Sequence, residues 1–395
     1  MGSNGFDHKL GVYSDITQMI ASPENPTPLV RVNQLNSNKD FPFYLKLERY
    51  NPFGSVKDRI ALEMLKELEI GDRTVVEASS GNTGIAIVCI ANAWGIPVEI
   101  AVPEKIPDEK KIMLKLLGAK VIEADDALCP LFPNEGARGM VSALIKSPST
   151  KDKRVSPNQY ENELNIQAHY RATGPEIWQQ TQGKVTHFFA GYGTCGTITG
   201  VGRYLKEQNP KIKIIGVEPF FPNHKLPGMK RITGLAGEFV PKILDRSVID
   251  ETVHVSDDDA YQTAIDLARK DGIPVGPTTG AILFAALEYA KAGEGLAVVI
   301  SPDDAFKYTS FYQDFLHTEP ETITTQTVDL SGFVCPAPKV KVIEVIETMD
   351  DGETAKIILG DRASLKSVVQ ELKARRIKPA FEQTDESKFV LTFSK

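Results

Sequence analysis

A lysine that could do chemistry lies in residues 51–59, which read NPFGSVKDR. Lys57 follows a Gly-Ser pair and directly precedes an expected helix, Asp58–Leu68, so the neighbouring backbone can hold it in place. A lysine whose pKa is lowered by desolvation can form a Schiff base with an aldehyde cofactor. Most lysines at helix starts are solvated, so this segment alone predicts no particular chemistry.

Two later loops could bind anions. Residues 79–84 (SSGNTG) and residues 191–197 (GYGTCGT) each follow an expected strand and open an expected helix. Small residues at such turns leave backbone N–H groups free, and these groups together with the positive helix end suit a carboxylate or a phosphate. Ser, Asn and Thr are also ordinary N-cap residues, but the first loop carries more polar groups than a cap needs.

The second loop also spells G-x-G-x-x-G, and Glu218 ends the following strand, where a ribose-binding acid would stand. A nicotinamide-dependent dehydrogenase is therefore an alternative on this motif alone. It explains neither the other anion loop nor the preceding lysine.

A fourth motif, residues 276–281 (GPTTGA), is expected at a further strand-to-helix junction. The hydroxyl of Thr278 could bond a ring nitrogen and keep it neutral, whereas an Asp would keep the ring protonated. Taken alone, the motif is more typical of a capping turn.

Together the motifs follow the order of one known family. From about Ile16 to Tyr312 the chain resembles the fold-type II pyridoxal-phosphate (PLP) enzymes, specifically the cysteine synthases or serine sulfhydrylases. The resemblance is carried by NPFGSVKDR, SSGNTGIA, NQY followed by ATGPEIW, GYGTCGTITG and GPTTGA. It implies a two-lobed α/β fold, bound PLP, a homodimer, and β-replacement on an activated serine through an α-aminoacrylate.

The resemblance also implies a role for individual residues. Lys57 would form the Schiff base and take the Cα proton. The cofactor-binding residues would be Lys57, Asn82, Gly193, Thr194, Cys195, Gly196, Thr197 and Thr278. The substrate carboxylate would be held by Ser79, Ser80, Asn82, Thr83 and Gln159. The chain departs from the family at Cys195, where Gly, Ser or Thr is usual, and at Thr278, where Ser is usual.

The leaving group stays open between O-phosphoserine and O-acetylserine. Residues 226–231 (LPGMKR) resemble an IPGIRR string that occurs with both substrate classes. Arg231 could hold a phosphate through two hydrogen bonds, or it could belong to an exposed surface pair.

Near the C-terminus, residues 328–338 (VDLSGFVCPAP) resemble the CPxP signature of the TusA/SirA-like sulfur carriers. The prolines suit a helix start, and a cysteine at such a position favours thiolate or persulfide. The resemblance implies that Cys335 carries persulfide sulfur toward the PLP site as a second catalytic residue, with a partner such as a cysteine desulfurase as donor.

The expected elements organise these motifs into domains. Strands and helices alternate over the first three hundred or so residues, which predicts parallel sheets with helices on both faces, in two lobes around a cleft. We expect a catalytic domain over residues 1–316 (smaller lobe roughly 45–155), a linker over 317–327, and a βαβαββ carrier domain over 328–395. Pro130–Arg154 is expected to be exposed or mobile.

Composition narrows the function classes. A formal net charge of −7 argues against general nucleic-acid binding, and no apolar run is long enough to cross a bilayer. Residues 1–9 show no signal-peptide pattern, and neither the four cysteines nor the six histidines have disulfide or metal-ligand spacing. We therefore expect a cytoplasmic protein without a metal site or nucleic-acid partner.

Two other functions stay in view. One is a cystathionine β-synthase-like enzyme whose nucleophile is not sulfide, although no haem or nucleotide-sensing module is recognised. The other is a sulfur-relay protein with a regulatory PLP domain, against which Lys57 and the intact anion loops count.

Overall fold

The computed structural model describes residues 11–104, 108–124, 136–221, 224–234, 240–291, 293–316, 325–349, 353–375, 377, 379–385 and 388–395. The chain divides into two compact units, Met1–Phe315 and Leu316–Lys395, and each is described by itself.

The larger sheet of the first unit has the strand order β1-β2-β10-β7-β8-β9. Its strands are β1 (Leu29–Arg31), β2 (Phe43–Leu47), β7 (His187–Gly191), β8 (Lys213–Pro219), β9 (Glu251–Val255) and β10 (Ala297–Ser301). β1 pairs antiparallel with β2, and every following pair is parallel. All residues of β10 are buried, as expected for a strand covered on both faces.

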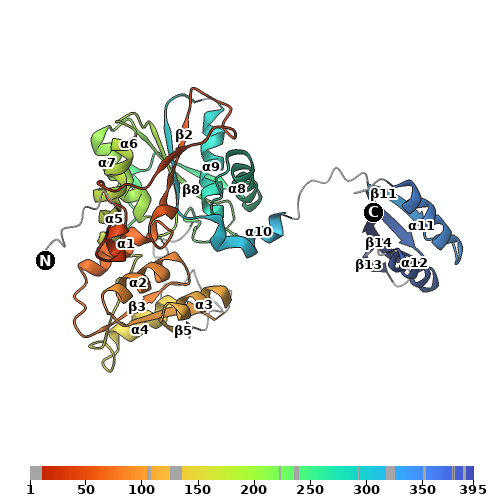
Figure 1. Ribbon diagram of the computed structural model, residues 1–395, viewed down its shortest axis with the longest axis horizontal. Helices are drawn as coiled ribbons and strands as arrows, with labels where there is room; N and C mark the ends of the chain where they lie inside the picture. The colour runs from red at the N-terminus through yellow and green to blue at the C-terminus, as the bar shows by residue number, and fades with distance from the viewer. Residues whose placement is uncertain are drawn as a thin grey trace. The chain divides into compact units, whose positions relative to one another are not determined.

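The smaller sheet is parallel, in the order β5-β4-β3-β6. Its strands are β3 (Thr74–Ala78), β4 (Val98–Pro103), β5 (Lys120–Ala124) and β6 (Arg154–Val155). Each sheet has its own apolar core. Figure 1 shows the two lobes one above the other, with α2, α3 and α4 around the smaller sheet.

Helices pack on both sheets of this unit. Their bounds are α1 (Lys57–Lys66), α2 (Asn82–Ala93), α3 (Asp108–Leu116), α4 (Gly136–Lys146), α5 (Glu163–Ala168), α6 (Gly174–Gln180), α7 (Gly196–Gln208), α8 (Asp257–Asp271), α9 (Pro277–Ala290) and α10 (Thr309–Leu316). A π-helical turn, His169–Thr173, joins α5 to α6, and a short 3-10 helix, Ala305–Tyr308, precedes α10.

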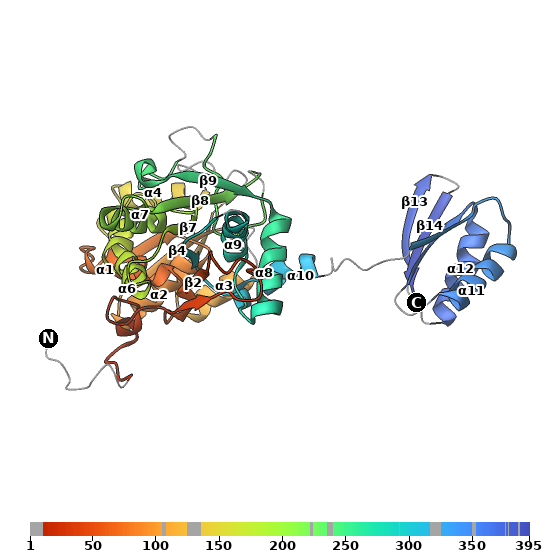
Figure 2. The same ribbon diagram turned by 90° about the horizontal axis from the view of Figure 1, so that it is seen from above.

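The second unit has the element order expected for it. Its elements are β11 (Thr325–Leu330), α11 (Ala337–Thr348), β12 (Thr354–Leu359), α12 (Arg362–Ala374), β13 (Ala380–Asp385) and β14 (Lys388–Ser394). The strand order is β11-β12-β14-β13. Among the described strands of this unit, β11 and β12 pair in parallel and the other two pairs are antiparallel. Figure 2 shows α11 and α12 on one face of this sheet.

The expected fold class, a two-lobed α/β protein with parallel sheets and a small C-terminal α/β domain, is confirmed. Element ends differ by a few residues. β11 begins at Thr325 instead of Val328, because residues 325–327 pair with β12. β13 is Ala380–Asp385.

Two local expectations are wrong. Within Pro130–Arg154, residues 136–146 form α4, and Ala137 and Val141 are buried against the smaller sheet because they recur at helical spacing. Residues 130–135 lie outside the described part, as do Cys129 and residues 1–9. Also, no strand precedes α9 within the described residues 272–276; an irregular segment joins it to α8.

Candidate active site

The anion loops both lie where a parallel strand ends and a helix begins, which is where open α/β sheets bind ligands. The first loop joins β3 to α2. Ser79 N donates to the Ala101 carbonyl at 3.1 Å, and Ser79 Oγ accepts from Gly84 N at 3.0 Å. A Cβ on Gly84 would lie 2.7 Å from the Ser79 carbonyl oxygen, so this tight turn requires glycine.

The second loop joins β7 to α7 and is equally tight. A Cβ on Gly193 would lie 2.7 Å from the carbonyl oxygen of Gly228, and one on Gly196 would collide with the side chain of Asn165. Cys195 is the N-cap of α7 with a φ of 70°, in the left-handed region. Burial raises the pKa of its thiol to about 12, so Cys195 is a neutral group that shapes the loop.

Lys57 is the first residue of α1 and faces the space between the two loops. Its backbone N donates to Ser55 Oγ at 3.2 Å, and the preceding Val56 N donates to the Pro302 carbonyl at 2.9 Å. Desolvation lowers the pKa of the Lys57 ammonium, and the nearby Asp303 opposes this effect. A lowered pKa leaves more neutral amine, which is the form that attacks an aldehyde.

A cluster that the sequence did not indicate surrounds Asn82. Asn82 Nδ2 donates to Asp303 Oδ2 at 2.6 Å, and Tyr308 OH donates to the same oxygen. Lys307 Nζ donates to Asn82 Oδ1 at 3.1 Å and to the Gly54 carbonyl at 2.9 Å. Burial raises the pKa of Asp303, whose Oδ1 has no hydrogen-bond partner. The position of Asp303 just after the buried strand β10 was the available signal.

Gln159 joins the first loop to the larger lobe. Thr83 Oγ1 donates to Gln159 Oε1 at 2.7 Å. Asn165 Nδ2 donates to the Gln159 carbonyl at 2.7 Å and to Thr194 Oγ1 at 3.1 Å, and Asn165 Oδ1 is buried without a partner. Asn165, which the sequence analysis missed, therefore links both anion loops.

His169, on the π-helical turn, holds the far end of the second loop. Its Nε2 is 3.1 Å from Thr197 Oγ1, and its Nδ1 is 2.9 Å from Thr173 Oγ1. Burial lowers the pKa of His169 to about 3, so a neutral ring positions the Thr197 hydroxyl.

Two cavities of about 260 Å³ and about 70 Å³ share part of their walls, including Lys57, Asn82, Gly193, Thr194 and Tyr308. The predicted residues that line one or both are Lys57, Ser79, Ser80, Asn82, Thr83, Gln159, Gly193, Thr194, Cys195, Thr197 and Thr278. Gly196 lies buried in the loop wall.

Arg231 differs from the other predicted residues. Among the described residues that line these cavities, its neighbour Lys230 is present and Arg231 is not. The backbone after Arg231 turns toward Glu218, which accepts from Ile232 N at 2.7 Å and from Thr233 N at 3.1 Å.

Glu218 also bears on the dehydrogenase alternative. Its side chain is fully buried and its Oε1 is 2.8 Å from His254 Nε2. Glu218 Oε2 already accepts the backbone hydrogen bonds from Ile232 N and Thr233 N, and the side chain is fully buried, so Glu218 has no exposed carboxylate to offer a ribose; this counts against a dinucleotide site at the G-x-G-x-x-G loop.

The cavity residues fit PLP. The tight turn of residues 193–197 at the start of α7 would hold its phosphate, and Lys57 would bind its aldehyde carbon. Asn82 would bond the ring oxygen. The Thr278 hydroxyl, which donates to the Pro227 carbonyl at 3.0 Å, lines the same cavity as Lys57 and would contact the ring nitrogen.

In the second unit, Cys335 is exposed just before α11, whose N-cap is Pro336. The apolar side chains beside it are also exposed: Phe333 (48%), Val334 (75%) and Val340 (52%). Such a surface can be approached by another protein. Within the described residues, no helix has the length and apolar character needed to cross a membrane.

Comparisons with known proteins agree with this geometry. A family model for pyridoxal-phosphate dependent enzymes matches residues 20–303, and one for sulfurtransferase TusA matches residues 326–395. A cysteine synthase of Aquifex aeolicus is 43% identical over 303 residues, 73% of this chain and 90% of that protein. A cysteine synthase B of Salmonella typhimurium is 38% identical, over 69% of this chain and 88% of that protein.

Among solved structures, a cysteine synthase of Entamoeba histolytica matches with a TM-score of 0.70 and 29% identity, covering 81% of this chain and 94% of that one. A hydrogen sulfide-producing enzyme of Fusobacterium nucleatum matches with a TM-score of 0.65 and 34% identity, over 75% of this chain and 100% of that one. The chain therefore belongs to the family of pyridoxal-phosphate-dependent enzymes, uses PLP as its cofactor, and carries a TusA domain at its C-terminus.

Proposed function

We propose that this enzyme makes cysteine by replacing the β-substituent of an activated serine with sulfur. The observation that carries the proposal is the position of Lys57 in a cavity between two anion-binding loops. Relatives named cysteine synthase, 38–43% identical over most of the catalytic unit, support it.

The protein's own residues divide the work. Ser79, Thr83 and Gln159, with the free N–H groups at the start of α2, bind the substrate carboxylate. The amine of Lys57 takes the Cα proton, for which its lowered pKa suits it. When bound, PLP supplies the electron sink for the charge that develops at Cα.

Two sources of sulfur fit this reaction. Free sulfide can add its lone pair to Cβ directly. We propose that Cys335 also delivers sulfur, because it is exposed at the start of a helix in a TusA domain. The terminal sulfur of a Cys335 persulfide would form the bond to Cβ, and a small thiol would then reduce the resulting disulfide and release cysteine. A cysteine desulfurase is the proposed donor.

A second candidate reaction has specific support. Relatives also include a cystathionine β-synthase of Apis mellifera, 37% identical, and an O-acetylserine dependent cystathionine β-synthase of Bacillus subtilis, 33% identical. In such a reaction a thiol amino acid replaces sulfide as nucleophile in the same cavity.

One assay tests the two reactions together. The holoenzyme is given an activated serine with either sulfide or homocysteine, and the products are separated. Sulfide is expected to give cysteine with at least a tenfold higher kcat/KM. A preference for homocysteine would reverse the assignment, and no product with either would reject β-replacement.

We further propose a cytoplasmic homodimer, on the family resemblance. Size-exclusion chromatography with light scattering should give twice the 43.4 kDa chain mass. A monomer that turns over at full rate would contradict the dimer.

A further inference from the structure

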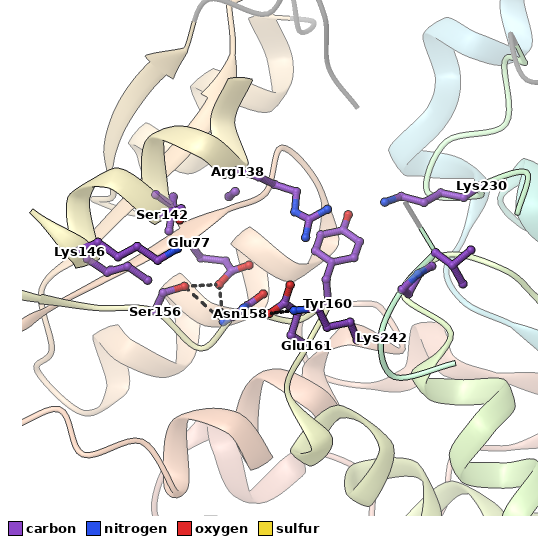
Figure 3. Close-up of a pocket in the computed structure, with 15 residues that line it drawn as sticks. Glu77, Arg138, Ser142, Lys146, Ser156, Asn158, Tyr160, Glu161, Lys230 and Lys242 are labelled. Atoms are coloured by element: carbon purple, nitrogen blue, oxygen red, sulfur yellow. Dashed lines mark hydrogen bonds and ion pairs between the residues drawn. The ribbon is translucent and has the colours of Figure 1, made fainter. Parts of the chain in front are cut away.

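The cavity of about 260 Å³ that is lined by Lys57 and both loops is called the substrate cavity. A third cavity, of about 420 Å³, shares Ala78, Arg138, Tyr160 and Lys230 with it. Figure 3 shows its wall, around which four basic side chains are distributed together with Glu77 and Glu161. The basic side chains are Arg138 and Lys146 from α4, and Lys230 and Lys242 from the segments between β8 and β9.

Of these four basic side chains, Arg138 and Lys230 also line the substrate cavity. Arg138 Cζ lies 4.4 Å, and Lys230 Nζ 4.1 Å, from the centre of the Tyr160 ring. Figure 3 shows the two side chains approaching Tyr160 from opposite sides. Among the described residues, no ion pair is found for either cation, although the charge of Arg138 acts on the nearby Glu77 carboxyl and, against the larger effect of burial, favours a lower pKa. Contact with the ring holds both cations in place without neutralising them.

The acidic groups of the same wall have hydrogen-bond or ion-pair partners of their own. Glu77 accepts hydrogen bonds from Asn158 N at 3.0 Å and Ser156 Oγ at 3.2 Å, and burial raises its pKa to about 7, an effect that Arg138 opposes. Glu161 is paired with Lys242 at 3.1 Å.

The backbone at both Arg138 and Lys230 is held in place by its surroundings. Lys230 N donates to the Tyr192 carbonyl at 2.7 Å, which ties it to the loop expected to hold the cofactor phosphate. Arg138 follows Ala137, which is 5% exposed and packs α4 on the smaller sheet. The two charges are therefore set in advance at the wall of the substrate cavity, on different lobes.

We propose that Arg138 and Lys230 together bind the phosphate of O-phosphoserine, so that the activated serine this enzyme prefers is the phosphate ester. This inference rests on the proposed β-replacement function. An acetyl ester is neutral and offers these cations no counter-charge, whereas a phosphate monoester brings up to two negative charges. Arg binds phosphate through paired hydrogen bonds and Lys acts as a point charge.

The same contacts assist the reaction. Lys57 takes the Cα proton, the Cβ–O bond breaks, and its electron pair leaves with the phosphate oxygen as inorganic phosphate. The sulfur lone pair forms the new Cβ–S bond, and the proton returns to Cα. Arg138 and Lys230 stabilise the negative charge that grows on the leaving oxygen.

The test compares kcat/KM for O-phosphoserine and O-acetylserine in the wild-type holoenzyme and in Arg138→Gln and Lys230→Gln. Wild type should prefer phosphoserine. Each variant should lose tenfold to hundredfold more on phosphoserine than on acetylserine, the size expected for a charge-assisted hydrogen bond. Lys146→Gln, which lines only the third cavity among those described, serves as the matched control and should keep the wild-type ratio.

A second readout does not depend on phosphoserine turnover. Inorganic phosphate should inhibit wild-type acetylserine turnover competitively, and the inhibition constant should rise at least tenfold in Arg138→Gln and in Lys230→Gln. Arg138→Lys should recover part of the affinity.

Several results would overturn the inference while leaving the proposed function intact. These are equal losses on both esters, wild-type use of acetylserine only, or a selective loss in Arg231→Gln in place of Lys230→Gln. If wild type makes cysteine from neither ester, the proposed function fails together with the inference.

Discussion

The two units of the chain place their reactive side chains in opposite surroundings. Lys57 lies in a cavity, and desolvation lowers the pKa of its ammonium. Cys335 lies exposed before α11, beside exposed Phe333 and Val334. An amine that moves a proton on a bound substrate gains from excluded water, whereas a thiol that exchanges sulfur with other proteins must be reachable.

The cores of the first unit (the catalytic unit) and the second unit (the carrier unit) also differ, in how much charge they bury. In the catalytic unit, Arg59 is buried with Glu48 at 2.6 Å and with Glu176 at 2.5 Å, and Lys46 Nζ lies 2.6 Å from Glu176. The core of the carrier unit is apolar. The large unit thus buries an ionic network, whereas the buried side chains among the described residues of the second unit are apolar apart from Thr354 and Ser364.

The largest effect is expected from removing the buried amine of the catalytic unit. Lys57→Ala should lower cysteine formation by about 10³-fold or more, because proton transfer by a positioned group contributes roughly 10²–10⁴-fold. Steady-state assays with sulfide measure this loss. Borohydride trapping and peptide mapping should locate the cofactor on Lys57 in wild type. Turnover of the variant at the wild-type rate would contradict the assignment.

Cys335→Ser removes the exposed thiol of the second unit. Turnover with free sulfide should stay within about twofold of wild type. Turnover that depends on a persulfide donor such as a cysteine desulfurase should fall roughly 10²-fold, because tethering holds the carrier at mM effective concentration. Cys89→Ser, at a half-buried cysteine of α2, is the matched control.

The carrier role predicts a direct mark as well. Mass spectrometry after incubation with a desulfurase should show added sulfur on Cys335. If Cys335→Ser is silent with both sulfur sources, the second unit has another role.

Glu176→Gln sharpens the comparison of the cores. Removing one charge from the buried network should cost about 3–5 kcal/mol in the free energy of unfolding of the catalytic unit. Glu163→Gln, at an exposed partner 3.9 Å from Arg203, should change it by less than about 1 kcal/mol. Urea unfolding followed by tryptophan fluorescence reports this unit selectively, because Trp94 and Trp178 both belong to it. Equal effects of the two substitutions would contradict the network's role.

The smallest expected effect concerns the charge beside Lys57. Asp303 raises the pKa of Lys57, so Asp303→Asn should lower that pKa further. The PLP-free protein takes up PLP through the neutral amine of Lys57. The pH dependence of the rate of PLP uptake should therefore shift to lower pH in Asp303→Asn, by about one pH unit. Asp304→Asn, which keeps the cap to Phe306 N, is the control. A shift to higher pH, or none, would remove Asp303 from this role.

Much of the site was determined by local sequence. Gly84, Gly193 and Gly196 lie where a Cβ would collide with neighbouring atoms. Turns of this kind between a strand and a helix can be recognised in a sequence, because they require small residues at fixed spacing. The helix that begins at Lys57 and the helix that follows Cys335 are predicted from local pattern in the same way, and the alternation of strands and helices predicts the parallel sheets.

Tertiary structure alone decided which distant residues meet. Asp303 accepts a hydrogen bond from Asn82, 221 residues away. Asn165 connects Thr194 of the second loop to Thr83 of the first through Gln159. Whether Lys230 or Arg231 faces the substrate cavity depends on a one-residue choice of loop direction, set by hydrogen bonds to Tyr192 and Glu218. Sequence spacing cannot encode these pairings, because they arise from the packing of strand ends that are far apart along the chain.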